Sequence, residues 1–420
     1  MPPPPSWSSQ VSAAVPEATR KAMANIEQSF FLSEEKLKAI QEKFVQDFRL
    51  GYSKYGQAMA MIPTFVTGVP NGSETGRSRW NKPVRATAAL LNPTKPAVVV
   101  LLQDALDRKN LHVKCTALVN DTVGTLLSHA YATGDCLLGA IFGTGTNGAF
   151  VEKTASFTKM GSALSEVKSE YMVVNTEWGA FDNERAVLDV TPFDNKLDRE
   201  SINPRFQCFE KLISGMYLGE ITRNILLYLI DNNMLFSGRS TDDINKHYGF
   251  DTALLLYLID NNMLFSGRST DDINKHYGFD TALMSTIESD NSADLSLVRQ
   301  TLVKELNLED KWIKKADLEI VRWACQCVGT RAALLSGVAV AATIKQTGAK
   351  TNISIGIDGS LFEFYPDFEK RLRLRTRLRL SLQLLVGPEI EKEVKIGRAK
   401  DGSGVGAALC ALQASKQTKS

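Results

Sequence analysis

The chain has 420 residues, which is enough for two domains of ordinary size, each with its own core. Its apolar share of 44%, beside 23% charged residues, is typical of a globular protein and excludes a disordered or fibrous one. The net charge is +2, so no global electrostatic field attracts nucleic acid or a membrane surface, and we expect neither as a partner.

The cysteines lie scattered through apolar stretches, which indicates a reducing compartment. Cys325 and Cys327 could be a metal-binding pair, but none of the four histidines lies near them, so we expect buried thiols and no metal site. The proline-rich start, Met1–Ser9, lacks the apolar centre of a signal peptide. The longest apolar stretch, Ala332–Ile344, is too short to cross a bilayer. These features predict a cytosolic (cytoplasmic) protein without a membrane span.

The first clear helix signal begins at Ser33-Glu-Glu-Lys, where Ser33 is a suitable cap. The apolar residues that follow recur at helical spacing and predict one buried face: Leu37, Ile40, Phe44 and Phe48. An extended, turn-rich connector, Met61–Gly76, comes after this helix.

Asp121 stands between a strand-like run and a stretch with helical character that begins at Val123. Spacing alone favours Asp121 as the N-cap of that helix. A carboxylate in this place also suits general-base chemistry in which the proton moves only as a new bond to the oxygen forms. The residues alone leave both interpretations open.

A glycine-rich string, Phe142-Gly-Thr-Gly-Thr-Asn-Gly148, lies between two apolar runs. Backbone N–H groups at Gly143 and Gly145 can approach phosphate oxygens, and the hydroxyl of Thr144 adds one donor. The alternative is a two-residue β-hairpin turn at Asn147-Gly148. The two interpretations are compatible with each other.

Two further acids, Glu177 and Glu210, are candidates for holding a hydroxylated ligand. Glu177 lies in the unusual string Asn175-Thr-Glu-Trp-Gly-Ala-Phe181, and Glu210 lies on a probable helix over residues 210–225. An isolated glutamate is usually solvated surface, which is the alternative for each. Sugars, however, are commonly held by several carboxylate and amide groups.

In this order and wording, the strings around Asp121, Gly143 and Glu177 resemble the eukaryotic hexokinase family, its fungal members most closely. The resemblance implies an α/β, actin-like ATPase (ribonuclease H-like) fold whose two domains close on a sugar and MgATP. It implies an ATP:hexose 6-phosphotransferase of glycolysis that uses ATP and Mg²⁺. The implied substrate is glucose, with fructose and mannose as further candidates.

The same resemblance assigns roles to single residues. Asp121 would take the proton from the sugar's 6-hydroxyl as that oxygen attacks the γ-phosphate. The sugar-binding residues would be Asn120, Asn147, Glu177 and Glu210. Two later strings, 329–333 and 355–362, resemble nucleotide-binding segments, for which a turn before a helix is the alternative. The ATP-binding residues would be Gly143, Thr144, Gly145, Thr330, Gly359 and Ser360.

Part of the family pattern is missing. In the family the connector leads into a small domain with an Asp-Leu-Gly-Gly-Thr-Asn phosphate loop. Here residues 77–98 are basic, are broken by prolines and match no part of the family that we can place. We therefore expect the small domain to be largely absent, which leaves a non-catalytic relative, a residual binder or a truncated gene product as the alternative function. The expected order is 1–76 as N-terminal helix and connector, 77–98 as the unmatched segment, 99–400 as the large domain and 401–420 as a C-terminal helix.

Two stretches lie outside the resemblance. Leu226–Leu254 is repeated without one change as Leu255–Leu283, which indicates a recent tandem duplication or an assembly error and not a solenoid. The basic run Lys370–Leu380 could be a nucleic-acid patch or a lengthened surface element, and the lack of aromatic residues within it favours the surface element.

The duplication leads to a stability prediction. The first copy continues smoothly from Ile225 and the second runs smoothly into Met284, so each copy has one native-like junction. We expect the material between, around Ser237–Asp260, to form a surface excursion. Deleting Leu255–Leu283 should then raise the melting temperature in a thermal unfolding curve recorded beside the parent chain. A lower midpoint would show that the second copy is an integrated part of the fold.

Overall fold

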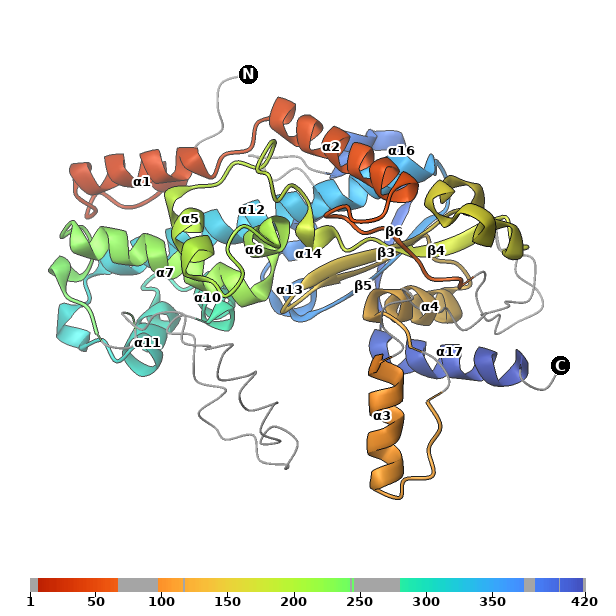
Figure 1. The fold of residues 1–420 in the computed structure, drawn as a ribbon. Coiled ribbons are helices and arrows are strands. Elements are labelled where there is room, and N and C mark those ends of the chain that lie inside the picture. The colour runs from red at the N-terminus through yellow and green to blue at the C-terminus, as the bar shows by residue number, and fades with distance from the viewer. Residues whose placement is uncertain are drawn as a thin grey trace. The chain divides into compact units, whose positions relative to one another are not determined.

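The computed structural model describes residues 7–66, 97–115, 118–241, 244, 280–373, 382–399 and 401–417 (Figure 1). Most of the unmatched segment, of the second copy of the repeat and of the basic run therefore lies outside the described residues.

The chain forms two compact units that alternate along the sequence. The first, here the helical unit, comprises Met1–Ala39, Asp182–Gly337 and Phe364–Ser381. The second, here the sheet unit, comprises Ile40–Phe181, Val338–Glu363 and Leu382–Ser420, and it holds all the described strands. The domain boundaries expected from the sequence follow family segments instead of compact units, and they stay a prediction.

Among the described residues the sheet has six strands, in the order β1-β4-β3-β2-β5-β6 (Figure 1). Neighbours from β1 to β2 along this order are antiparallel, whereas β5 runs parallel to both β2 and β6. A mixed sheet covered by helices is the α/β class that the sequence predicts. The strands are β1 (Ile62–Pro63), β2 (Leu138–Phe142), β3 (Thr146–Lys153), β4 (Tyr171–Asn175), β5 (Ile353–Asp358) and β6 (Val394–Arg398).

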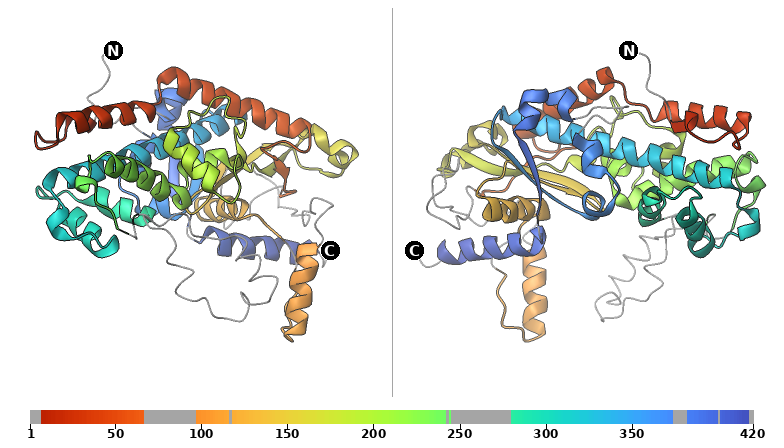
Figure 2. Two further views of the ribbon diagram at one scale, coloured as in Figure 1. Left: turned by 60° about the vertical axis from the view of Figure 1, so that its left-hand side comes forward. Right: turned by 180° about the vertical axis from the view of Figure 1, so that it is seen from behind.

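Two helices of the sheet unit, α4 (Asp121–Thr133) and α17 (Gly402–Gln417), lie side by side (Figures 1 and 2). A Cβ atom on Gly406 would be 2.1 Å from the Cα atom of Gly124, and one on Gly124 would be 2.7 Å from the carbonyl oxygen of Gly402. Three glycines therefore let the two helix backbones touch.

The helix expected after Ser33 is α2 (Glu34–Ser53), and its cap is present, because the Ser33 hydroxyl accepts the N–H of Lys36 at 3.1 Å. Its predicted apolar face is buried, since Leu37, Ile40, Phe44 and Phe48 are each 2% exposed or less. Within the sheet unit, the Phe44 ring stacks on that of Phe181 at 3.6 Å between centroids.

The helix expected over residues 210–225 is interrupted. Ser214 has an extended backbone, with φ −93° and ψ 152°, between α6 (Cys208–Ile213) and α7 (Gly215–Asp231). The physical reason lies in the Ser214-Gly215 pair, because serine and glycine favour helix less than the residues around them do. The prediction of one continuous helix is therefore wrong at this pair.

Both described ends of the duplicated stretch are built into the helical unit. At its start, α7 runs past Ile225 and buries Leu226 and Leu229 completely. At its end, α10 (Thr281–Ser289) packs on α7, with Met284 fully buried and the Thr281 hydroxyl accepting the N–H of Gly219 at 2.9 Å. The excursion predicted between these ends lies largely outside the described residues.

The remaining helices complete the two units. They are α1 (Glu17–Ser29), α3 (Ala97–Arg108), α5 (Pro192–Glu200), α11 (Ser296–Glu305), α12 (Lys315–Thr347), α13 (Ser360–Phe364), α14 (Phe368–Arg373), α15 (Leu382–Val386) and α16 (Pro388–Lys392). Short 3₁₀ turns are η1 (Trp7–Ser9), η2 (Thr154–Ser156), η3 (Thr158–Glu166), η4 (Trp178–Ala180), η5 (Phe236–Gly238) and η6 (Asp310–Trp312).

Among the described helices, α12 is long and apolar enough to cross a membrane, judged by length and composition alone. Its most apolar 18-residue window is entirely buried inside the protein. A buried core helix passes the same test. Cys325 and Cys327 lie in this helix and are fully buried, as the sequence predicts. Burial raises the pKa of the Cys325 thiol well above its ordinary value.

His129 occupies a niche in the sheet unit that two strand glycines create. It is 5% exposed and lies across β5 and β6, where a Cβ atom on Gly356 or Gly397 would come within 2.5 Å of it. Its Nε2 atom is 3.1 Å from the hydroxyl of Ser354. Burial in this niche lowers the pKa of His129.

A pH-dependent contribution to stability follows from this niche. Because the pKa of His129 is lowered on folding, the unfolded chain binds the proton more readily, and stability falls as the pH drops below about 6.5. The stability that wild type has over His129→Gln should shrink on acidification by at most about 1.4 kcal/mol per pH unit. Denaturant unfolding at several pH values measures this. His112→Gln, at an exposed histidine, is the control, and a pH-independent difference for His129→Gln would contradict the prediction.

Candidate functional site

The first turn of α4 carries Asn120 and Asp121. Asn120 is the N-cap: its backbone is extended and its side-chain oxygen accepts the N–H of Thr122 at 2.9 Å. Asp121 is the first helical residue, and its side chain is exposed. The N-cap position that spacing assigned to Asp121 therefore belongs to Asn120. The Oδ1 atom of Asp121 also accepts the N–H of Thr122 at 2.9 Å, and the carboxylate is exposed at the positive end of the helix dipole.

The glycine-rich string forms the turn between β2 and β3. Phe142 pairs with Thr146, so the turn consists of Gly143, Thr144 and Gly145, with Thr144 exposed. The alternative turn at Asn147-Gly148 is wrong, because both residues lie within β3 and pair with β2. The hairpin turn thus begins four residues earlier than the hairpin signal suggested, and the N–H of Gly143 donates to the carbonyl oxygen of Gly145 at 3.1 Å. The phosphate-binding role of this turn stays a prediction.

The nucleotide-like string after β5 lies directly beside this turn. β2 and β5 are parallel neighbours, so Phe142 and Asp358 end at the same edge of the sheet. A Cβ atom on Gly359 would be 2.5 Å from the carbonyl carbon and oxygen of Phe142, and one on Gly143 would be 3.2 Å from the Cα atom of Gly359. Ser360, exposed, begins α13. Ligands of α/β sheets bind at such carboxyl ends of strands.

The first turn of α4, which begins with Asp121, lies close to the end of β5 and to the start of α17. The Thr125 hydroxyl donates to the carbonyl oxygen of Asp121 at 3.0 Å. A Cβ atom on Gly402 would be 2.6 Å from that hydroxyl and 3.1 Å from the Oδ2 atom of Asp358. The first turn of α4, the end of β5 and the start of α17 therefore meet at Gly402. Asp358 is a candidate site residue that sequence reasoning did not select, and its signal was a strand ending in Asp-Gly.

A polar cluster joins β3 to the end of β4. Asn147 donates from Nδ2 to the Oδ1 atom of Asn175 at 2.8 Å and to the Oε1 atom of Glu177 at 3.3 Å. Asn175 donates from Nδ2 to the same Oε1 atom at 2.7 Å. Within the described part of the chain, no donor is paired with the Oε2 atom of Glu177. The structure thus brings Asn147 and Glu177 together, and adds Asn175.

The backbone around Glu177 is held in an uncommon conformation. Glu177 has φ 57°, in the left-handed region, immediately before the buried Trp178. The indole N–H of Trp178 donates to the Thr146 hydroxyl at 3.0 Å, and its ring fills the space where Gly148 would otherwise carry a Cβ atom. Strain of about 1–3 kcal/mol at such a residue persists only where the surroundings impose it, and it is common at functional sites.

Glu210 and Thr330 belong to the helical unit. Glu210 is half-buried in the first turn of α6, whereas Thr330 is 5% exposed within α12. Gln207, the residue before α6, was not selected from the sequence. It has φ 54°, and its Oε1 atom is buried without a hydrogen-bond partner among the described residues. An orphaned amide oxygen three residues before Glu210 is the kind of group that a polar ligand would satisfy.

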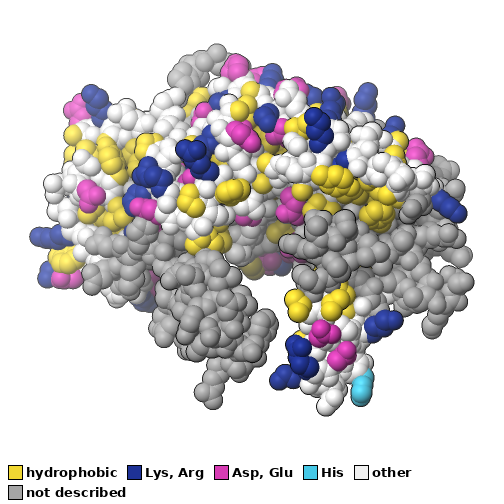
Figure 3. Space-filling model, in the orientation of Figure 1, with side chains coloured by type: hydrophobic (Ala, Val, Ile, Leu, Met, Phe, Trp, Pro, Cys, Tyr) yellow, Lys and Arg dark blue, Asp and Glu magenta, His cyan; other side chains and the backbone are white. Residues whose placement is uncertain are grey.

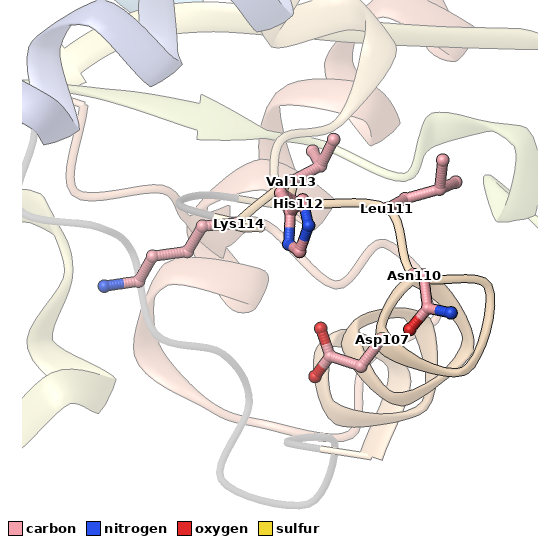
Figure 4. A pocket seen from close by; sticks show the side chains of 6 residues that line it. All are labelled: Asp107, Asn110, Leu111, His112, Val113 and Lys114. Atoms are coloured by element: carbon pink, nitrogen blue, oxygen red, sulfur yellow. The ribbon is translucent and has the colours of Figure 1, made fainter.

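The described residues contain no group of three or more His, Cys, Asp or Glu side chains that could hold a metal ion. On the face seen in Figure 3, charged side chains of both signs are interspersed with hydrophobic ones. Figure 4 shows a pocket of about 370 Å³ at the end of α3, and none of the predicted site residues lines it. Its lining residues are Asp107, Asn110, Leu111, His112, Val113 and Lys114.

The contact between the two turns can be tested with alanine at Gly359. Gly359 and Gly387 have φ 113° and 87°, so alanine at either costs about 1–3 kcal/mol of backbone strain. Only at Gly359 does the new Cβ atom also meet Phe142, whereas nothing lies within 4 Å at Gly387. We expect Gly359→Ala to lower the melting temperature clearly more than Gly387→Ala. Equal losses would show that the turns separate without cost.

Two family models described as hexokinase match the chain, one over residues 22–79 and 78–131 and the other over 137–258 and 253–413. The match to the first of these models is split at residues 78–79, near the start of the segment 77–98. The second part of that match begins at residue 78 and therefore runs through this segment. The second model divides at residues 253–258, where the two copies of the repeat meet.

Fungal relatives match over most of the chain. A glucokinase of Aspergillus niger is 40% identical over 76% of the chain and 61% of its own length, and glucokinase-1 of Kluyveromyces lactis is 38% identical over 76% and 62%. Hexokinase-2 of Schizosaccharomyces pombe is 33% identical over 93% of the chain and 75% of its own length. The chain thus spans about three fifths of the length of the two glucokinases.

A solved structure of similar fold is the hexokinase from Schistosoma mansoni complexed with glucose. It has a TM-score of 0.74 and 26% identity over 95% of this chain and 99% of that one. This similarity confirms the actin-like ATPase fold. With family models covering more than half of its residues, the chain belongs to the hexokinase family.

Proposed function

We propose that the chain carries the large-domain half of an ATP:hexose 6-phosphotransferase site. The observation that supports this best is one edge of the sheet unit, where the turn over residues 143–145 contacts Gly359 at the end of β5, and where the end of β5 and the helix turn bearing Asp121 meet at Gly402. Phosphoryl transfer depends chiefly on positioning and on neutralising charge, which such an edge provides.

The sugar is a hexose of the glucose type. Asn147, Asn175 and Glu177 are hydrogen-bonded to one another, so their orientations are fixed before a ligand arrives. The Oε2 atom of Glu177 would accept a sugar hydroxyl. By family resemblance Asn120 and Glu210 would bind the sugar too, and the orphaned amide oxygen of Gln207 supports a further contact near Glu210. Glucose is present in the similar Schistosoma mansoni structure, and fructose and mannose are further candidates.

Asp121 would act as the general base. The Oδ1 atoms of Asn120 and Asp121 share the N–H of Thr122, each at 2.9 Å, so the exposed Asp121 carboxylate would face a ligand with its Oδ2 atom. It would accept the proton of the 6-hydroxyl as the new phosphorus–oxygen bond forms. The bond from the γ-phosphorus to the β–γ bridging oxygen breaks, and that electron pair leaves with ADP.

The phosphates of ATP would lie against the turn over residues 143–145, with Gly359 and Ser360 toward the adenosine. The fit rests on close backbone approach, because a Cβ atom on Gly143 or Gly359 would occupy the space between the turns. Mg²⁺ supplies charge neutralisation on the phosphates, and it usually needs only one or two protein carboxylates, for which Asp358 is a candidate.

A second candidate function is a non-catalytic relative that binds sugar or nucleotide weakly. It is favoured by coverage, since the matched part of the chain spans only about three fifths of the two fungal glucokinases, and by the division of a family model at residues 78–79. Lacking the opposing phosphate loop, such a chain could not exclude water by closure.

A coupled assay of glucose phosphorylation with MgATP separates the two. We expect the chain as it stands to turn over more than about tenfold slower than Aspergillus niger glucokinase, because the opposing loop is absent. A chimaera that receives the intervening segment of that enzyme between residues 76 and 98 should regain turnover. In the chimaera, Asp121→Ala should lower kcat by about 10²–10⁴-fold and leave glucose affinity largely intact.

Asp104→Ala, at an exposed acid on α3, is the matched control and should change neither quantity. An equal loss of glucose binding in Asp121→Ala would show that Asp121 is structural. A folded chimaera that binds glucose without turnover would favour the non-catalytic relative.

A further inference from the structure

Lys211, the residue that follows Glu210 on α6, is a buried lysine whose ammonium group is fully used. It is 3% exposed, and its Nζ atom donates to the Oδ1 atom of Asp198 at 2.7 Å, to the Ser201 hydroxyl at 2.9 Å and to the carbonyl oxygen of Asn203 at 2.8 Å. An ammonium group has three donors, and all of them are satisfied here.

Asp198, on α5, is the centre of this cluster. Besides Lys211 it accepts a guanidinium N–H of Arg185 at 2.5 Å and the backbone N–H of Arg205 at 3.1 Å. Burial alone would raise the pKa of the Asp198 carboxyl, but the hydrogen bonds from Lys211 and Arg205 and the charges of Lys211 and Arg185 hold it below its ordinary value. The Asp198 carboxyl is therefore ionised at neutral pH, whereas burial lowers the pKa of Lys211 and the Asp198 carboxylate opposes that shift.

Besides the burial of its apolar residues, helix α6 has few contacts that fix its first turn. It is six residues long, and its N-cap residue, Gln207, makes no side-chain capping hydrogen bond. The N–H of Cys208 is instead accepted by the side chain of Asn183 at 3.1 Å. Isolated helices of this length are unstable in water, so α6 depends on such tertiary anchors.

Glu210 lies between these anchors. The neighbouring residues Phe209 and Lys211 are buried, while Glu210 itself is only half-buried. We propose that Lys211 and Asp198 are positioning residues for Glu210: by tying α6 to α5 they fix where the Glu210 carboxylate meets a sugar hydroxyl. This inference rests on the proposed function in so far as Glu210 is a sugar ligand.

A buried ion pair is a costly way to hold a helix, since well-packed apolar residues often stabilise as much. Its advantage is geometric specificity. Three hydrogen bonds from one ammonium group fix the position of α6 relative to three acceptors, whereas apolar contacts are less directional. That distinction predicts a specific consequence for ligand binding beyond any loss of stability.

The test is glucose titration calorimetry at millimolar ligand on the full chain, with Lys211→Met, Asp198→Asn, Glu210→Gln and the Lys211→Met/Glu210→Gln double variant. Lys211→Met and Asp198→Asn should each weaken glucose binding by about tenfold. Combined with Glu210→Gln, Lys211→Met should add less than about a twofold change, because it acts through Glu210. Equal effects of Lys211→Met in both backgrounds would overturn the inference.

Arg371→Met is the matched control, because it breaks another buried ion pair of the helical unit, with Glu288, and should leave glucose affinity unchanged. An equal loss of affinity in Arg371→Met would also overturn the inference, because it would reveal general destabilisation.

Hydrogen exchange of the amides of residues 208–213 decides the matter independently of sugar binding. In Lys211→Met these amides should exchange at least about tenfold faster, without the same change in Arg371→Met. If wild type binds no glucose while exchange rises in this way, the proposed function fails together with the sugar contact of Glu210, and only the anchoring of α6 by Lys211 stands. Unchanged exchange in α6 would overturn the positioning role whether or not glucose binds.

Discussion

Close approach between backbones is the constraint on which the sheet unit depends. Where β2 and β5 end, Gly143 and Gly359 leave no room for a Cβ atom between the two turns, and where α4 meets α17 the same holds for Gly124 and Gly406. The distances at these contacts cannot increase by a change of side-chain rotamer, because the atoms involved belong to the main chain. These backbone contacts place the turn at residues 143–145 and the first turn of α4 at one edge of the sheet.

Polar groups at this edge are arranged before any ligand binds. The Asn147–Asn175–Glu177 cluster aligns two amides on one carboxylate oxygen, and Trp178 holds Glu177 in a left-handed conformation that a glutamate would otherwise avoid. A site that needs little reorganisation stabilises developing charge better than one that must first order its dipoles. Strained residues of this kind cluster at functional sites, which agrees with the place of Glu177 in the candidate site.

The helical unit uses buried charge for a comparable purpose. Arg331 forms a bidentate pair with Asp194, at 2.7 and 2.6 Å, while Asp194 also completes the capping box of α5 with Thr191. One turn further along α5, Asp198 joins this helix to α6 through Lys211. Consecutive turns of α5 thus anchor two other helices, which explains how short, polar helices keep fixed positions in a unit that has no strand among its described residues.

Local features of this protein can be read from neighbouring residues. The cap at Ser33 and the buried face of α2 follow from spacing within one helix, and the glycine-rich string predicts both a hairpin and a phosphate cradle, because turn chemistry depends on a few consecutive residues. The resemblance to the hexokinase family likewise comes from short runs of consecutive residues, those around Asp121, Gly143 and Glu177.

Other features depend on pairing between distant segments. Asn120 and not Asp121 caps α4, since capping depends on the backbone angles that the packed helix imposes. The turn falls at residues 143–145 because Phe142 pairs with Thr146. Asn175 and Asp358 join the site through the β3–β4 and β2–β5 registers, which bring together residues far apart in the chain. No local pattern contains that register, because it is set by the burial of whole strands against their neighbours.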